Sequence, residues 1–295
     1  MTIPPTKERT AEDRPRLAAG LYFIATPIGA ARDITLRALD ILAAADVLAA
    51  EDTRTLRHLM EIHGIPLGRR PLLAYHDHNG EAARPRLMAA LKDGKSVVYA
   101  SEAGTPLVAD PGYQLARAVI AENLPLIAAP GPSAVLAALS VAGLPTDRFL
   151  FAGFLPNTTS ARCRSLTDLR DVPATLLFYE SPKRLARSLK DMAATLGPSR
   201  DAAVCRELTK RFEEVTRGKL EFLAETFADR DVKGEIVIVV DRASPRVVDE
   251  HMIKEALLGI LKEMSVKDAA TEVAQRLGIP RRDVYQVALT LEGKT

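Results

Sequence analysis

The chain has 295 residues, 47% of them hydrophobic, and its 40 Lys and Arg nearly balance 38 Asp and Glu to give a net charge of +2. This composition is typical of a soluble globular protein with one large domain or two ordinary ones, and the charge does not by itself demand a nucleic-acid partner. The longest apolar runs are broken by Pro, Gly and Ser, which argues against a membrane span of about 18–20 uninterrupted apolar residues.

The start of the chain and its cysteines point to a cytoplasmic protein. Residues 1–16 are polar and lack the apolar stretch of a signal peptide, so we expect a disordered leader. Cys163 and Cys205 are too few for a disulfide framework and fit a reducing compartment.

Residues 17–147 predict an α/β domain with a parallel sheet. Short apolar runs alternate with segments of helical periodicity, and the runs are continuous, as in strands buried on both faces. Asp33 is a plausible N-cap for the first helix. The expected strands are 21–26, 47–52, 71–78, 95–104 and 125–133, and the expected helices are 33–46, 53–64, 81–94, 112–124 and 134–144.

The remaining sequence predicts a second α/β domain and a helical module. Residues 148–241 contain the strand-like segments "ATLLFYE", "DAAVCREL" and "GEIVIVV" with helical segments between them. After a Pro-containing linker at 241–246, residues 247–295 are helical throughout, and the last two helices resemble a helix-turn-helix that Ser265 would cap.

Three bends in the first domain are rich in Gly and Pro, at residues 25–30, 101–112 and 129–134. Each bend follows a predicted strand, and ligands of open parallel sheets bind beyond the carboxyl ends of the strands. Because Gly has no Cβ, main-chain groups at these bends could reach a ligand directly. The patterns of a P-loop and of a dinucleotide fingerprint are both missing from the sequence, so we expect a ligand that is not anchored by pyrophosphate.

Seven motifs along about 220 residues resemble one known family. They are "YFIATPIG…DITLRAL", "AAEDTR", "SEAGTPLVADPGY", "PGPSA", "GLPTDRFLFAGFLP", "FYESP" and "RELTK". Together they are similar to the ribosomal RNA small-subunit methyltransferase I family, which has the tetrapyrrole methylase-like fold of two α/β domains. The helical end of the chain also resembles the C-terminal module of many members. Glu102 and Ala30 depart from the family pattern, which usually has Asp and Asn there.

The resemblance implies an enzyme that methylates the ribose 2′-hydroxyl of a cytidine in the decoding region of 16S ribosomal RNA. The methyl donor would be S-adenosylmethionine, held between the two α/β domains, and members are typically homodimers. Two alternatives stay open at this point: a related enzyme acting on a tetrapyrrole or diphthamide precursor, and a non-catalytic ribosome-assembly factor.

The bends and the matching motifs together predict the cofactor contacts. The predicted residues are Pro27, Gly29, Ser101, Glu102, Gly104, Thr105, Pro132, Ser133, Ala134, Tyr179, Leu208 and Gly234.

Removal of the hydroxyl proton calls for a base, and acids at strand ends of the second domain are the candidates. Glu207 is the first choice, although a salt bridge with Arg206 or Lys210 is an equally good explanation of its position. Glu180 is a second candidate. Lys210 could act as a neutral amine if burial lowered its pKa, and would otherwise orient the ribose or bind phosphate.

RNA contacts are expected from two basic windows, residues 54–95 and 162–217, each of which carries four more Lys and Arg than Asp and Glu. No metal site is predicted, because the His76–Asp77–His78 cluster has no further ligand in support. The predicted RNA-binding residues are Arg54, Arg57, His76, Lys183, Arg184, Arg206 and Arg211.

Overall fold

The structure is a computed structural model that describes residues 17–76, 79–243, 250–261, 264–277 and 279–292. The chain divides into two compact units, residues 1–242 and 243–295, and each is described by itself. The predicted leader, residues 1–16, and half of the predicted linker, residues 244–246, lie outside the described residues.

The first sheet is parallel throughout, as the continuous apolar runs predict. Its strand order is β3-β2-β4-β1-β5, and every residue of β1, β2 and β4 is buried. The strands are β1 (Gly20–Ile24), β2 (Val47–Ala50), β3 (Leu72–Ala74), β4 (Ser96–Ala100) and β5 (Leu126–Ala129).

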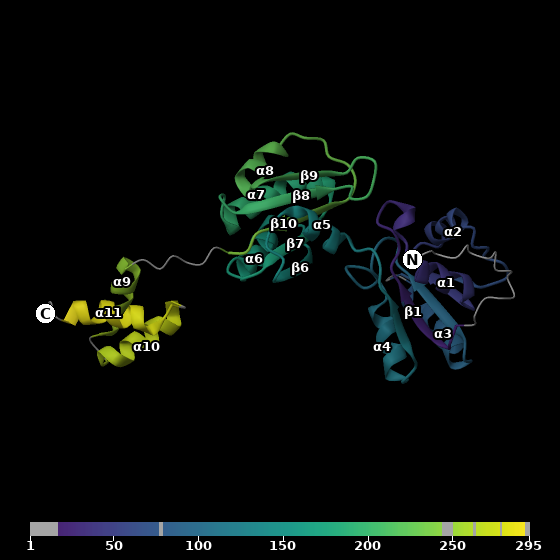
Figure 1. The fold of residues 1–295 in the computed structure, drawn as a ribbon, viewed down its shortest axis with the longest axis horizontal. Helices are drawn as coiled ribbons and strands as arrows, with labels where there is room; N and C mark the ends of the chain where they lie inside the picture. Colours follow the sequence, from purple (N-terminus) through teal and green to yellow (C-terminus); the bar gives the residue numbers. More distant parts are fainter. Residues whose placement is uncertain (1–16, 77–78, 244–249, 262–263, 278, 293–295) are drawn as a thin grey trace, which may run out of the picture. The chain divides into compact units, whose positions relative to one another are not determined.

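Two helices cover each face of this sheet (Figure 1). Helices α1 (Leu36–Ala44) and α2 (Thr53–Ile62) pack on one face. Helices α3 (Gly80–Lys92) and α4 (Tyr113–Ala121) pack on the other. Successive residues of β1 alternate between the two cores, which is the period of two that a strand imposes.

The predicted N-cap of the first helix is wrong. Asp33 closes a short 3-10 turn, η2 (Ala31–Asp33), and Ile34 is extended. Thr35 caps α1 instead, because its side chain accepts a hydrogen bond from the backbone N–H of Ala38 at 3.1 Å.

The second sheet is mixed, with strand order β6-β7-β10-β8-β9. Only β6 and β7 are parallel; β10 is antiparallel to both of its neighbours, and β9 to β8. The strands are β6 (Phe149–Phe154), β7 (Thr175–Glu180), β8 (Asp201–Arg206), β9 (Glu214–Lys219) and β10 (Ile236–Val240). One face is covered by α6 (Thr159–Leu169), α7 (Leu185–Leu196) and α8 (Leu220–Thr226).

Helix α5 (Ala134–Ala142) joins the two halves of this unit. It follows β5 in sequence but packs its apolar side on the open face of the second sheet, against β8 and β10 (Figure 1). Its carbonyl end accepts hydrogen bonds from Arg217 of β9. The backbone N–H of Ala30, after β1, donates to the Thr209 hydroxyl at 3.1 Å. The bend after β1 therefore lies against the turn that follows β8.

The second unit contains α9 (Glu250–Ile260), α10 (Val266–Leu277) and α11 (Arg281–Glu292), packed around a small apolar core. Ser265 caps α10 as predicted, since its hydroxyl accepts from the backbone N–H of Asp268 at 3.2 Å. Among the helices in the described ranges, none combines the length and apolar character that a membrane crossing requires.

Candidate active site

The strand order explains why the three Gly- and Pro-rich bends come together. They follow β1, β4 and β5, which are neighbours in the sheet and parallel, so their carboxyl ends share one edge. Thr26 and Gly104 exchange two backbone hydrogen bonds of 2.9 Å. The hydroxyl of Thr105 donates to the carbonyl of Pro132, also at 2.9 Å. Main-chain and short side-chain contacts therefore tie the bends into one platform.

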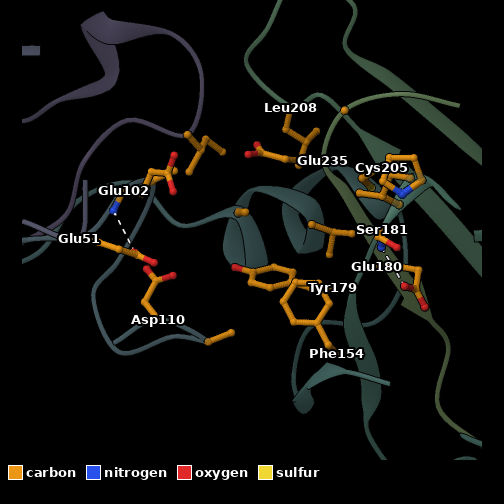
Figure 2. Close-up of a pocket in the computed structure, with 18 residues that line it drawn as sticks. Glu51, Glu102, Asp110, Phe154, Tyr179, Glu180, Ser181, Cys205, Leu208 and Glu235 are labelled. Atoms are coloured by element: carbon orange, nitrogen blue, oxygen red, sulfur yellow. Dashed lines mark hydrogen bonds between the residues drawn. The ribbon is translucent and has the colours of Figure 1, made fainter. Parts of the chain in front are cut away.

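A cavity of about 410 Å³ opens beside this platform, within the range of small-molecule sites (Figure 2). It is lined by both halves of the first unit. The lining residues are Ile28, Glu51, Glu102, Ala103, Ala109, Asp110, Ala134, Phe154, Tyr179, Glu180, Ser181, Pro182, Cys205, Leu208, Gly234, Glu235, Ile236 and Val237.

One wall of the cavity is acidic. Figure 2 shows the side chains of Glu51, Glu102 and Asp110 gathered on the same side. The backbone N–H of Glu102 donates to the carboxylate of Glu51 at 3.5 Å. Burial, together with the nearby charges of Glu51 and Glu102, raises the pKa of Asp110 to about 7. Three converging carboxylates create a negative potential that suits a cationic ligand.

The facing wall is aromatic. The rings of Phe154 and Tyr179 lie edge to face with centroids 5.5 Å apart, and the Tyr179 hydroxyl points toward Asp110 (Figure 2). Burial and the charges of Asp110 and Glu235 raise the pKa of Tyr179 to about 12, so its hydroxyl keeps its proton at neutral pH. An aromatic face opposite a carboxylate wall can hold both a planar ring and a cation.

The turn after β8 carries an ion-pair network at the cavity rim. The ammonium of Lys210 lies 2.9 Å from the carboxylate of Glu207 and 2.8 Å from that of Glu235. Burial alone would lower the pKa of Lys210, but these two hydrogen bonds outweigh it and raise that pKa. Burial likewise opposes ionisation of Glu207, but Lys210 and the N–H of Glu235 lower its pKa below the usual value. The structure thus favours the salt-bridge explanation of Glu207, and Lys210 is a cation rather than a neutral amine.

Backbone strain accompanies this network. Glu207 and Thr209 have φ of +51° and +64°, in the left-handed region that side chains avoid. Gly234, with φ of +95°, approaches so closely that a Cβ would lie 2.3 Å from the Glu207 carboxyl carbon.

Gly234→Ala should therefore displace the Glu207 side chain and distort the cavity rim. We expect a loss of about 2–3 kcal/mol in unfolding free energy and at least tenfold weaker binding of S-adenosylmethionine, the ligand that the sequence resemblance implies, measured by thermal melting and calorimetry. Gly197→Ala is the matched control, because Gly197 has φ of +115° and open space around its Cβ position. Equal effects of the two substitutions on ligand affinity would contradict this role of Gly234.

Glu180 is buried at the end of β7 and is fully engaged. Its carboxylate accepts from the backbone N–H of Ser181 at 2.8 Å and from the hydroxyl of Ser188 at 2.5 Å, and it pairs with Arg184 at 3.2 Å. This arrangement fixes the start of η3 (Pro182–Arg184) beside the cavity.

The predicted cofactor residues fall into two groups. Those that line the cavity are Glu102, Ala134, Tyr179, Leu208 and Gly234. Those that build the bends behind it without lining it are Pro27, Gly29, Ser101, Gly104, Thr105, Pro132 and Ser133.

The two departures from the family pattern have different consequences. Ala30 contacts the second half of the unit through its backbone N–H, so its side chain is not used there. Glu102 lines the cavity with its own carboxylate.

The predicted RNA-binding residues differ in the exposure of their side chains and in their contacts within the protein. Arg57, Lys183 and Arg211 are exposed, and Arg54 is exposed although it pairs with Asp52 at 2.7 Å. His76 is half-buried, with its backbone N–H bonded to Asn79. Arg184 and Arg206 are mostly buried: Arg184 donates to Asn157 and to the carbonyl of Leu155, and Arg206 pairs with Glu214 at 3.1 Å. These last two guanidinium groups serve internal contacts.

Asp77 and His78 lie outside the described residues. Within the described ranges, no three His, Cys, Asp or Glu side chains are grouped closely enough to hold a metal ion.

Cys163 and Cys205 are both free thiols. Burial raises the pKa of Cys205 to about 11, so that thiol is unreactive.

Sequence reasoning missed Glu51, Asp110 and Glu235 in the cavity. Glu51 follows β2, which neighbours β4, so strand order alone brings Glu51 to Glu102. Asp110 lies within the bend "SEAGTPLVADPG", and the two acids of this bend are the sequence feature from which its place in the cavity could have been predicted.

Comparison with known proteins supports the fold and the type of chemistry. The family model of tetrapyrrole (corrin/porphyrin) methylases matches residues 20–224, and that of the RsmI C-terminal HTH domain matches residues 248–292. Cobalt-precorrin-4 methyltransferase has a TM-score of 0.58 at 18% identity over 75% of this chain and 94% of its own. A uroporphyrin-III C-methyltransferase from Thermus thermophilus, solved with S-adenosylhomocysteine, has a TM-score of 0.52 at 21% identity over 75% and 96%.

The curated relatives are more specific. A protein of Mesorhizobium japonicum named ribosomal RNA small subunit methyltransferase I is 49% identical over 277 residues, which cover 94% of this chain and 93% of the relative. The chain therefore belongs to the ribosomal RNA small subunit methyltransferase I family.

Proposed function

We propose that the chain transfers the methyl group of S-adenosylmethionine to the ribose 2′-hydroxyl of a cytidine in the decoding region of 16S ribosomal RNA. As a family member the chain is a methyltransferase of ribosomal RNA that uses S-adenosylmethionine. The cavity between the bends and the second sheet, with a carboxylate wall facing an aromatic one, supports the part of the proposal that concerns the methyl donor, and the proposed acceptor rests on the family. The solved tetrapyrrole methylases are too distant in sequence to favour their acceptors here.

The cavity fits the methyl donor. The carboxylates of Glu51 and Glu102 match a ligand with a sulfonium and an ammonium, and Tyr179 offers a face for a nucleobase. Gly104, with φ of +83°, permits the tight bend whose residues Glu102 and Ala103 line the site. The donor brings an electrophilic methyl group on sulfur, and the protein supplies alignment and proton transfer.

Asp110 is the proton acceptor in this proposal, rather than Glu207. A base is most effective when its pKa lies near the working pH, and that of Asp110 is about 7. Glu207 is stabilised as a carboxylate by Lys210, which makes it a weak base. Glu207, Lys210 and Glu180 act as positioning residues that hold the loops around the cavity.

RNA phosphates are proposed to contact the exposed cations Arg54, Arg57, Lys183 and Arg211. Such contacts fix register without reading sequence. The proposal takes residues 17–147 and 148–241 as the two α/β domains and 247–295 as the helical module, and it places the protein in the cytoplasm with its ribosomal substrate.

We also propose a homodimer. The outer strands β5 and β6 leave Leu126, Phe149 and Leu150 partly exposed, and apolar side chains on edge strands favour burial against a second copy. Light scattering of the purified chain should give about twice the monomer mass of 32.0 kDa. A monomer at micromolar concentration would contradict this part of the proposal.

The acceptor is tested with tritiated S-adenosylmethionine and two candidates, small ribosomal subunits from a strain lacking this enzyme and uroporphyrinogen. We expect label in the RNA of the subunits and none in the porphyrin. Label in the porphyrin would support the tetrapyrrole alternative. Binding of the donor without transfer to either acceptor would support an assembly role.

A further inference from the structure

The helical unit holds a second cavity, of about 330 Å³, that the methyl-transfer site does not use. It is lined by Lys267 from α10 and by Arg281, Arg282 and Tyr285 from α11. Two adjacent helices therefore direct three cationic side chains and one aromatic ring to the same hollow.

These cations are not neutralised within the described part of the unit. Arg281 donates to the backbone carbonyl of Lys267 at 3.5 Å, and its guanidinium lies 6.0 Å from the centre of the Tyr285 ring. None of the three cations lies within ion-pair distance of a described carboxylate, whereas Lys254 of the same unit does pair, with Glu250. Residues 243–295 contain eight Lys and Arg and eight Asp and Glu, so the cluster does not follow from an overall basic composition.

Folding stability does not explain where the cations are. All three lie in the first turns of their helices, beside Asp268 and Asp283, and the positive end of the helix dipole disfavours a cation there. A bound anion would reverse this cost, because the same dipole and the exposed N–H groups favour negative charge. The unfavourable placement, the open hollow and the lack of a carboxylate partner among the described residues point to an anionic ligand.

We propose that Lys267, Arg281, Arg282 and Tyr285 form a second RNA-binding surface that contacts the phosphodiester backbone of the substrate RNA. This inference rests on the proposed function for the identity of the RNA. The Lys and the two Arg can donate to phosphate oxygens, and the half-exposed Tyr285 ring can stack on an unpaired base. Binding of RNA to the same chain that carries the catalytic cavity raises the local concentration of substrate there.

The test compares two double substitutions in the full chain that remove the same charge. The double substitution Arg281→Ala with Arg282→Ala removes both arginine side chains that line the second cavity. Lys254→Ala with Arg276→Ala removes two cations that do not line it. Binding of 16S ribosomal RNA transcribed in vitro is measured by filter retention between 50 and 200 mM salt. Circular dichroism checks the helices, and calorimetry checks binding of S-adenosylmethionine.

We expect the first variant to bind RNA about tenfold more weakly at 150 mM salt and to lower the log–log salt slope by about 2, one for each phosphate that is no longer neutralised. The control variant should stay within about twofold of wild type. Arg281→Lys with Arg282→Lys should retain most of the affinity, since neutralisation of phosphates depends on the charge, which is kept.

Three results would overturn this inference: unchanged RNA binding in the first variant, an equal loss in the control, or an equal loss in the lysine variant. Failure of the proposed function is distinguishable, because it appears as wild-type chain that binds RNA without methylating small subunits.

Discussion

Asp110→Asn should lower kcat for methylation of small ribosomal subunits by about 10²–10⁴-fold, the usual contribution of a positioned base. The substitution keeps the shape of the side chain and removes its ability to take a proton. In wild type, kcat/KM should fall as pH drops through about 7, because Asp110 becomes protonated, whereas the residual activity of the variant should not follow this titration. Rates between pH 5.5 and 8.5 check this expectation.

The control is Asp40→Asn, at an exposed aspartate of α1 that does not line the cavity. It should keep wild-type rates at every pH. If the kcat of Asp110→Asn stays within threefold of wild type, Asp110 is not the proton acceptor, and Glu207 becomes the first candidate.

Asp110→Asn should also stabilise the fold at high pH. An aspartate in the unfolded chain ionises near pH 4, but Asp110 holds its proton in the fold until about pH 7. Asp110 therefore does not reduce the free energy of unfolding below pH 4, and its destabilising contribution grows as pH rises from 4 to 7. We expect Asp110→Asn to recover about 2 kcal/mol at pH 8, after allowance for solvent screening, and nothing at pH 4. Thermal melting at both pH values measures the difference.

The second large effect concerns Arg162, whose side chain is buried, with 1% of the residue's surface exposed. Its guanidinium lies 2.6 Å from the carboxylate of Asp191. It also donates to the carbonyls of Pro156 and Asn157 at 3.2 and 3.1 Å. Arg162 thus ties α6 to α7 and to the loop that follows Phe154 of the cavity.

Arg162→Ala should lower the free energy of unfolding by about 3–5 kcal/mol, because it leaves the buried charge of Asp191 without its ion-pair partner and removes the donor to the Asn157 carbonyl. Arg164→Ala, on the exposed side of the same helix, should change it by about 0.5 kcal/mol or less. Urea denaturation of both variants gives the values. A loss below about 1 kcal/mol for Arg162→Ala would contradict the structural role assigned here.

The first sheet could be predicted because its three central strands, β1, β2 and β4, are buried on both faces. Continuous apolar runs such as "SVVYA" mark β4, and Gly- and Pro-rich bends mark where the strands end. The second sheet was predicted less completely. The segment "EVTRGK" of β9 is half-exposed and polar, so it lacks the apolar signal, although it pairs along its full length with β8.

The cavity wall shows the limit of sequence reasoning more sharply. Glu51 and Glu102 are 51 positions apart, and only the order β2-β4 makes them neighbours. Composition likewise does not say whether a basic residue faces solvent. Arg184 lies in a basic window, but the carbonyl of Leu155 and the carboxylate of Glu180 take up its guanidinium. Both outcomes depend on long-range packing.

The position and chemistry of the transferred methyl group test the central claim most directly. RNA from small subunits treated with the purified chain and S-adenosylmethionine can be digested to nucleosides and examined by mass spectrometry. We predict 2′-O-methylcytidine, formed at a single position in the decoding region and formed about 10²–10⁴-fold more slowly when Asp110→Asn replaces wild type. A methyl group on a base, or on the ribose of another nucleoside, would contradict it.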